Sequence, residues 1–295
     1  MSSKLEEIPG GTCAPKGFRC GAVSCGIKNP DSDRLDLALI YSKYPTVGAA
    51  VFTQNEVSAA PVQLSSSYIK TTEPQAIVAN SGNANACTGL PGMDHARRMA
   101  VGISKGLGIK QRAVQVCSTG IIGVPLPIER IENKIPDLIE VLEKDGDSAA
   151  EAIMTSDTKP KSCSVKLTVN GESIRIGAIA KGAGMINPHM ATMLCFVTTD
   201  AAVSKAEIVA ATQEAVNASF NRISVKPITR GGKGSEEFRE ALTYVMLKLA
   251  KKIVADGERV TKLVEVQVRG ASSELDAQRI ARAVSNSKLV KCSWN

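Results

Sequence analysis

The chain has 295 residues, of which 43% are hydrophobic and 3% aromatic, and its formal net charge is +7. This length allows a sizeable core and two subdomains, and the composition makes Ala, Val, Ile and Leu the main core residues. The basic residues alternate with acidic ones, as in residues 130–147, without an interleaved aromatic platform. This pattern disfavours nucleic acid as a partner and suits an acidic small-molecule substrate.

The lack of long apolar stretches and the pattern of cysteines both indicate a protein of the cell interior. No stretch approaches the roughly 20 apolar residues of a membrane span, and residues 1–18 lack an apolar core of signal-peptide length. We therefore expect a cytoplasmic protein with no membrane partner. The eight cysteines form no C-x-x-C pair, and no cysteine neighbours His95 or His189. We expect small buried cysteines, with neither a metal site nor a disulfide framework.

The first half alternates β-rich runs with helical stretches. Strands are predicted over 35–42, 47–53, 75–80 and 112–116. Helices are predicted over 93–107, with Asp94 as N-cap, and over 128–144, where Pro136 should kink or divide the helix. A hairpin is predicted for 163–169 and 172–180, because both arms alternate around Asn170-Gly171.

The second half is predicted to be richer in helix. Ser204 and Glu207 form a capping box at the start of a helix over 204–219. A longer helix is expected over 235–257, a strand over 260–270 and a last helix over 272–287. This alternation of elements predicts a layered α/β protein.

Several polar, glycine-containing segments could carry chemistry. In "CSTGIIG", residues 117–123, a strand runs into a turn whose N–H groups could form an oxyanion hole or simply join strand to loop. The loop "ANSGNANACTG", residues 79–89, is of the kind that often lines sites. In "MTSDTKPK", residues 154–161, Thr155, Asp157 and Thr158 could cap a helix or bind substrate. Lys181 either snorkels to the surface or holds a carboxylate.

The segment "KGAGMINPHMATML", residues 181–194, contains a candidate nucleophile. His189 is an unsuitable base for Thr192 at a spacing of three residues, and we interpret it as a surface histidine. If the Ala191–Thr192 bond is broken, Thr192 gains an α-amino group with a reference pKa near 7.7–8.0. That amine could deprotonate the hydroxyl of the same residue. The cut could be internal, with Thr192 Oγ1 attacking the Ala191 carbonyl to form an ester that water hydrolyses.

Together these segments resemble the ornithine acetyltransferase (glutamate N-acetyltransferase) family. The similarity rests on "KGAGMINPHMATML", "ANSGNANACTG", "STGIIG", "MTSDT", "TTDA" and "NASFNRISV", in that order. It extends from about Gly17 to Val225 and from about Gly231 to Val290. The resemblance implies layered sheets and helices of the self-cleaving N-terminal-threonine acetyltransferase type. It also favours the oxyanion hole over the plain turn.

The resemblance implies a mechanism in arginine biosynthesis. Thr192 would take the acetyl group of N2-acetylornithine and pass it to glutamate, while Thr119 and the Gly120 N–H stabilise the oxyanion. Thr155, Lys181 and Thr192 would contact substrate. No metal or bound organic cofactor is implied, and acetyl-CoA is a further donor in some members. Cleavage would give an N-terminal chain of residues 1–191 and a C-terminal chain of residues 192–295, assembled as a dimer of the pair.

Two departures from the family pattern affect the expected activity. "KPITRGG" follows Val225 where the family has an acidic, Thr-rich run, which indicates an internal gap. The chain ends at "CSWN", where the family continues into a C-terminal region, so we expect a fold truncated there. A shortened, non-catalytic relative that at most self-cleaves therefore stands beside the acetyltransferase. An N-terminal-nucleophile amidase or aminopeptidase is a third, weaker hypothesis.

Overall fold

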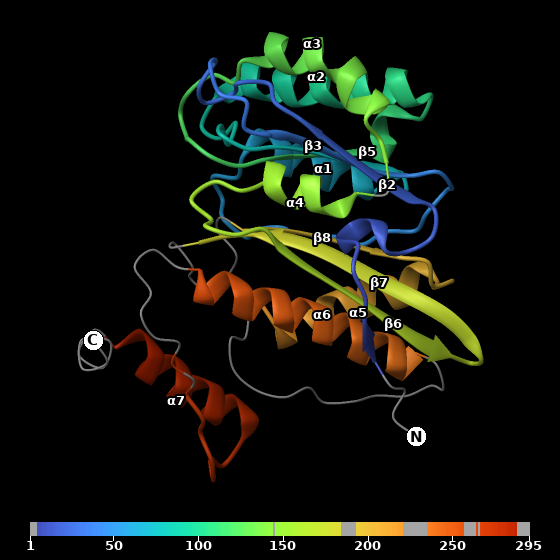
Figure 1. The fold of residues 1–295 in the computed structure, drawn as a ribbon. Helices are drawn as coiled ribbons and strands as arrows, with labels where there is room; N and C mark the ends of the chain where they lie inside the picture. Colours follow the sequence, from blue (N-terminus) through green and yellow to red (C-terminus); the bar gives the residue numbers. More distant parts are fainter. Residues whose placement is uncertain are drawn as a thin grey trace.

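The computed structural model describes residues 5–143, 145–183, 193–220, 235–256, 264 and 266–287, which form two four-stranded sheets stacked between helices (Figure 1). The predicted layered α/β class is confirmed in this form. The strands are β1 Glu6–Glu7, β2 Phe18–Val23, β3 Leu37–Ser42, β4 Ala76–Asn80, β5 Val114–Ser118, β6 Lys161–Val169, β7 Glu172–Lys181 and β8 Leu194–Thr199. The helices are α1 Ala60–Ile69, α2 Gly89–Leu107, α3 Ile128–Glu140, α4 Gly146–Ala152, α5 Lys205–Ala218, α6 Ser235–Ala255 and α7 Glu274–Asn286, with 3₁₀ turns η1 Gly11–Cys13 and η2 Gln111–Ala113.

The first sheet has the strand order β2-β3-β4-β5. β2, β3 and β4 are antiparallel, whereas β5 runs parallel to β4, so the carboxyl ends of β4 and β5 meet at one edge. α2 and α3 cover its outer face (Figure 1), where Leu39, Val78 and Met99 are fully buried. α1 packs beside β5. This half therefore places the residues that follow Asn80 and Ser118 next to each other.

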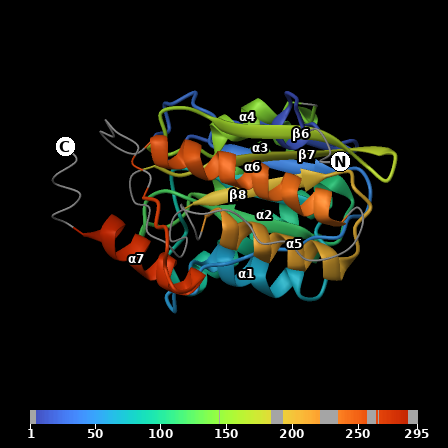
Figure 2. The same ribbon diagram turned by 90° about the horizontal axis from the view of Figure 1, so that it is seen from below.

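The second sheet has the order β1-β6-β7-β8 and is antiparallel throughout. α5 and α6 lie across its outer face (Figure 2), and Phe238, Val245 and Leu249 of α6 are buried there. α4 and η1 lie between the two sheets, where Ile153 packs with residues of both. α7 lies to one side of this stack (Figures 1 and 2).

The predicted hairpin and the predicted start of one helix, α5, can be followed residue by residue. β6 and β7 pair from Val169↔Glu172 outward, and the turn residues Asn170 and Gly171 have φ of 52° and 85°. Positive φ at both positions matches a type I′ turn, which confirms the hairpin. Ser204 caps α5 by accepting from the Glu207 N–H. The Glu207 carboxylate instead binds Arg239 and Ser235 of α6, so only one half of the predicted capping box forms.

The strand predicted over 47–53 is wrong. Gly48 N donates to the Glu73 carboxylate at 2.9 Å, and the Thr46 hydroxyl donates to the Pro74 carbonyl. The Gly48 N–H is therefore bonded to a side chain rather than to a strand, and β3 already has a neighbour on each side. The segment is apolar because it is partly buried, with Val51 packed against the core of the second sheet.

Other predicted boundaries also change. α2 begins at Gly89, five residues before Asp94, so Asp94 is not an N-cap; Pro91 lies in the first turn, where its missing N–H costs nothing. α3 continues through Pro136 without division. Residues 194–199, for which no strand was predicted, form β8. In the strand predicted over 260–270, residues 264 and 266–270 have no strand structure, and the others lie outside the described residues.

The cysteines follow the predicted pattern in part. Cys13, Cys20, Cys25 and Cys163 are buried, whereas Cys87 is exposed. Burial raises the pKa of the Cys117 thiol to about 12.

Among the helices of the described ranges, none combines the length and the apolar character that a bilayer crossing requires.

Candidate functional site

Two interlocked loops continue β4 and β5 at the edge where both strands end. Thr119 N donates to Asn80 O at 2.9 Å, Ile121 N to Gly82 O at 3.2 Å, and Ala84 N to Ile121 O at 2.9 Å. Backbone bonds thus run in both directions between the loops. This bonding fixes the position of the 119–121 turn.

Buried asparagines hold the same loops from inside. Asn80 Oδ1 accepts from the Ser118 hydroxyl at 2.6 Å, and Asn80 Nδ2 donates to Asn83 O at 2.8 Å. Asn83 Nδ2 donates to Val124 O and Pro125 O, at 3.1 and 3.2 Å. The polar composition of residues 79–89 therefore braces the turn that carries Thr119 and Gly120.

Gly120 has a conformation that suits glycine. Its φ is 137°, and a Cβ built on it would lie 2.3 Å from the carbonyl carbon of Gly82. The Thr119 N–H donates to Asn80 O, whereas the Gly120 N–H donates to no acceptor within the described residues. A backbone N–H of this kind is available to a developing oxyanion.

Lys181 joins three segments that are distant in sequence. It is the last residue of β7 and is only 4% exposed, so snorkelling to the surface is wrong. Its Nζ donates to Thr155 Oγ1 at 2.7 Å and to Thr119 Oγ1 at 3.2 Å. The structure therefore brings together Thr119, Thr155 and Lys181. An ammonium group can only donate, so both hydroxyls accept from it and each keeps its own hydrogen for another acceptor.

Asp157 has a fully buried side chain, and its Oδ2 is 3.9 Å from Lys181 Nζ. Its carboxylate accepts from Lys161 Nζ and Gly182 N, both at 2.7 Å, and from Thr155 N at 3.1 Å. None of Thr155, Asp157 and Thr158 caps a helix of the described chain; Thr158 binds Asp256, which follows α6.

The charges in this region affect one another. Burial lowers the pKa of Lys181 below its usual value, and nearby Lys161 adds to this, whereas the Asp157 carboxylate opposes both. Burial alone would raise the pKa of Asp157, but hydrogen bonds from Lys161, Gly182 N and Thr155 N outweigh it and lower that pKa. Asp157 therefore remains ionised at neutral pH.

Sequence reasoning missed Lys161 and Asp256. Lys161 Nζ also contacts Asp256 at 2.5 Å, which closes a buried chain of alternating charges. The local signal for Lys161 was a lysine at the start of a buried strand, four residues after an aspartate. Asp256 is 95 residues further along, and no spacing in the sequence relates the two.

Ala191, Thr192 and His189 lie outside the described residues. β8 begins two residues after Thr192, and its first residue, Leu194, pairs with Lys181.

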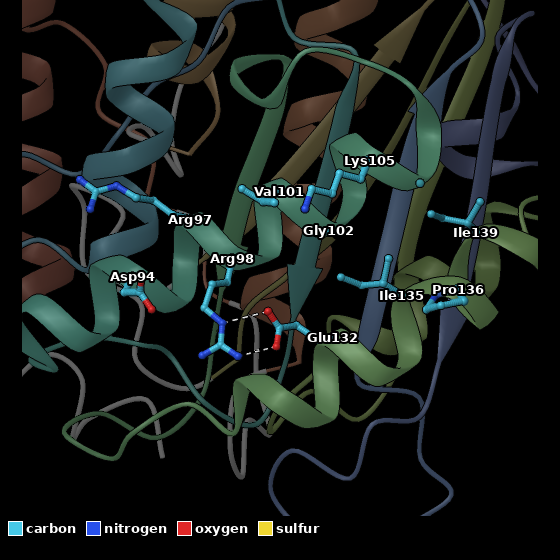
Figure 3. A pocket seen from close by; sticks show the side chains of 11 residues that line it. Asp94, Arg97, Arg98, Val101, Gly102, Lys105, Glu132, Ile135, Pro136 and Ile139 are labelled. Atoms are coloured by element: carbon cyan, nitrogen blue, oxygen red, sulfur yellow. Dashed lines mark hydrogen bonds and ion pairs between the residues drawn. The ribbon is translucent and has the colours of Figure 1, made fainter.

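A separate groove lies on the outer face, between α2 and α3 (Figure 3). It measures about 640 Å³, and Arg98 crosses it to Glu132, with Nε to Oε1 at 2.9 Å. Its lining residues include none of the predicted site residues. We therefore distinguish it from the site around Lys181.

The fold and this geometry define the class: a two-sheet α/β protein in which a buried ammonium, two hydroxyls and a backbone N–H without an acceptor in the described ranges lie where β4, β5 and β7 end or soon after. The same fold occurs in a crystal structure of a Pyrococcus horikoshii protein, with a TM-score of 0.52 at 12% identity over 84% of this chain and 87% of that one. At that identity the likeness concerns the fold alone.

The chain belongs to the ArgJ family, whose model matches residues 19–295. The arginine biosynthesis bifunctional protein ArgJ of Symbiobacterium thermophilum is 44% identical over 98% of this chain and 77% of its own length. That of Geobacter sulfurreducens is 47% identical over 95% and 76%. The family resemblance drawn from the sequence motifs is thereby confirmed.

Two solved structures agree with this membership. The ArgJ protein of Bacillus halodurans matches with a TM-score of 0.60 at 35% identity, over 66% of this chain and 100% of the solved chain. Ornithine acetyltransferase of Mycobacterium tuberculosis, solved in complex with ornithine, matches with a TM-score of 0.56 at 35% identity, over 65% and 100%.

Proposed function

We propose that this chain moves the acetyl group of N2-acetylornithine to glutamate through an ester on Thr192, as a step of arginine biosynthesis. Membership of the ArgJ family supports the reaction. The observation that carries the assignment of residues is the Lys181 ammonium, which donates to both Thr119 and Thr155. Those three residues are distant in sequence and meet at one point.

Thr192 is the proposed nucleophile. Cleavage before it frees an α-amine, which takes the proton from the hydroxyl as Oγ1 attacks the acetyl carbonyl. Leu194, the second residue after Thr192 in the sequence, is paired with Lys181, and this pairing supports a nucleophile that acts beside Lys181.

The remaining groups have complementary roles. The Gly120 N–H and the Thr119 hydroxyl stabilise the tetrahedral oxyanion, since both have a hydrogen to donate. Lys181 uses two of its three N–H bonds on the threonines, and the third binds the substrate carboxylate, beside the Thr155 hydroxyl. Ornithine leaves with the proton, and glutamate then accepts the acetyl group from the ester by the reverse steps.

The proposal includes two chains made from one. Residues 1–191 would form the N-terminal chain and 192–295 the C-terminal chain. We further propose a cytoplasmic dimer of the cleaved pair, with acetyl-CoA as an additional donor to be tested.

The test is acetyl transfer by the purified protein. Incubation with N-acetylornithine and glutamate should produce N-acetylglutamate, and N-acetylornithine alone should add one acetyl mass to the C-terminal piece. Thr192→Ala should lose both cleavage and transfer, whereas Thr192→Ser keeps an Oγ and should retain some cleavage. Transfer by Thr192→Ala at the parent's rate would contradict the mechanism. Cleavage without transfer would favour the shortened, non-catalytic relative.

A further inference from the structure

Asp157 is the centre of a buried cluster of four charges, hereafter the Asp157 cluster: Asp157, Lys161, Lys181 and Asp256. The exposed fractions of their side chains are 0%, 3%, 5% and 10%. Two ammonium groups face two carboxylates, so the cluster is neutral as a whole. Buried charges are tolerated when they are paired and hydrogen-bonded in this way.

Both oxygens of Asp157 accept backbone hydrogen bonds. Oδ1 accepts from Gly182 N at 2.7 Å, and Oδ2 accepts from Thr155 N at 3.1 Å. Gly182 follows Lys181 directly, so one carboxylate fixes the backbone of both segments that provide the proposed substrate contacts. Lys181 Nζ is 3.9 Å from Oδ2, beyond hydrogen-bond distance, so two of its N–H groups donate to the threonines and none is bound by Asp157.

We propose that Asp157 is a positioning residue for acetyl transfer. It holds the backbone of Thr155 and Gly182 so that the Thr155 hydroxyl and the Lys181 ammonium face the substrate, and its charge keeps Lys181 protonated. This inference rests on the proposed function, because it acts through Lys181 and Thr155.

The chemistry of the site requires a carboxylate rather than an amide. An asparagine has one acceptor oxygen and an NH₂ group that would face donors, either Thr155 N or the pair Gly182 N and Lys161 Nζ. The charge matters separately. Among the described residues, the charged groups that act on Lys181 are Asp157, which favours its ammonium form, and Lys161, which disfavours it. Loss of the Asp157 charge should therefore lower the pKa of Lys181 further.

The experiment compares Asp157→Asn with Asp256→Asn. Each variant removes one of the two carboxylates that pair with Lys161 Nζ, Asp157 at 2.7 Å or Asp256 at 2.5 Å. Asp256 is the control because it has no hydrogen bond or ion pair with Lys181, Thr155 or Gly182. Rates should be normalised to the cleaved fraction measured by denaturing electrophoresis. We expect Asp157→Asn to raise KM for N-acetylornithine about tenfold and to move the alkaline limb of kcat/KM to lower pH. Asp256→Asn should leave KM within about twofold of the parent and the limb in place.

The outcomes separate the two proposals. A parent protein that transfers no acetyl group overturns the proposed function and this inference with it. If the parent is active, equal KM values and equal alkaline limbs in the two variants overturn only the positioning role. If Asp157→Asn does not fold, the double variant Asp157→Asn, Lys161→Met removes both charges of that pair, and Asp256, which loses Lys161, keeps its hydrogen bonds from Thr158. It should also show the raised KM, and a parental KM there would overturn the inference.

Discussion

The ammonium of Lys181 is itself one of the proposed substrate contacts, and its ionisation should control substrate binding. Burial lowers its pKa, so the charge is lost as pH rises through a value below the usual 10.5. On the acid side, the Thr192 amine must be neutral to act as a base, and its reference pKa is about 7.7–8.0. We therefore expect kcat/KM to rise through that range and to fall again at a pH below 10.5. A pH series with N-acetylornithine tests this expectation. The amide of N-acetylornithine, which lacks the carboxylate, should show no Lys181-dependent alkaline limb, and an identical limb would contradict the role of Lys181.

At Gly120, conformation and contact both exclude a side chain. Gly120→Ala would place a methyl group 2.3 Å from the Gly82 carbonyl carbon, and the turn would have to move. Displacing the proposed oxyanion donor should reduce kcat by about 10²–10³-fold. Gly123→Ala is a matched control, because Gly123 also has a positive φ, 79°, but open space around its Cβ position. It should lose only about 1 kcal/mol of stability. Equal kcat losses in the two variants would show that the Gly120 turn has no special role.

At the scale of elements, the contact between η1 and β7 depends on the absence of side chains. A Cβ on Gly177 would lie 1.9 Å from the Gly11 carbonyl oxygen, and backbone cannot move aside as a side-chain end can. We expect Gly177→Ala to lower the free energy of unfolding by about 2–3 kcal/mol, measured by urea unfolding of uncut Thr192→Ala protein. Gly108→Ala, at a left-handed position with nothing within 4 Å, should cost about 1 kcal/mol. A smaller effect at Gly177 than at Gly108 would contradict this account of the contact.

Elements with local signals could be predicted from the sequence, and elements defined by distant partners could not. The β6–β7 hairpin follows from Asn170-Gly171 and the alternation beside it, because the turn and both strands are neighbours in sequence. The segment 47–53 has strand-like residues, but it joins neither sheet, and its Gly48 N–H donates to the Glu73 carboxylate instead. The same distinction applies to the site. Thr119, Thr155 and Lys181 came from family motifs, whereas the link from Lys161 to Asp256 spans 95 residues and left no pattern.

For the whole molecule, the two pieces of the cleaved protein should remain associated. β7 comes before the cut and β8 after it, and they pair from Lys181↔Leu194 to Ile176↔Thr199 within one sheet. α5 and α6, which also follow the cut, cover that sheet with buried apolar residues. We expect pieces of 191 and 295 − 191 = 104 residues to appear as two bands in denaturing electrophoresis but to co-elute in native size-exclusion chromatography. Uncut Thr192→Ala protein should elute at the same volume with one band. Separation of the pieces without denaturant would contradict the shared sheet.

If the chain is cut as proposed, the pairing of β7 with β8 also makes refolding depend on whether cleavage has already occurred. While the chain is whole, the covalent connection between β7 and β8 makes their pairing an intramolecular step, so each strand is at a high effective concentration for the other. If the proposed cut is made, we expect the folded sheet to persist, but its reassembly after unfolding becomes a second-order reaction that slows on dilution. A cell at micromolar protein concentration could therefore fold the whole chain readily and refold the cleaved one poorly. Thr192 would gain its amine through a step that commits each molecule to the fold it already has.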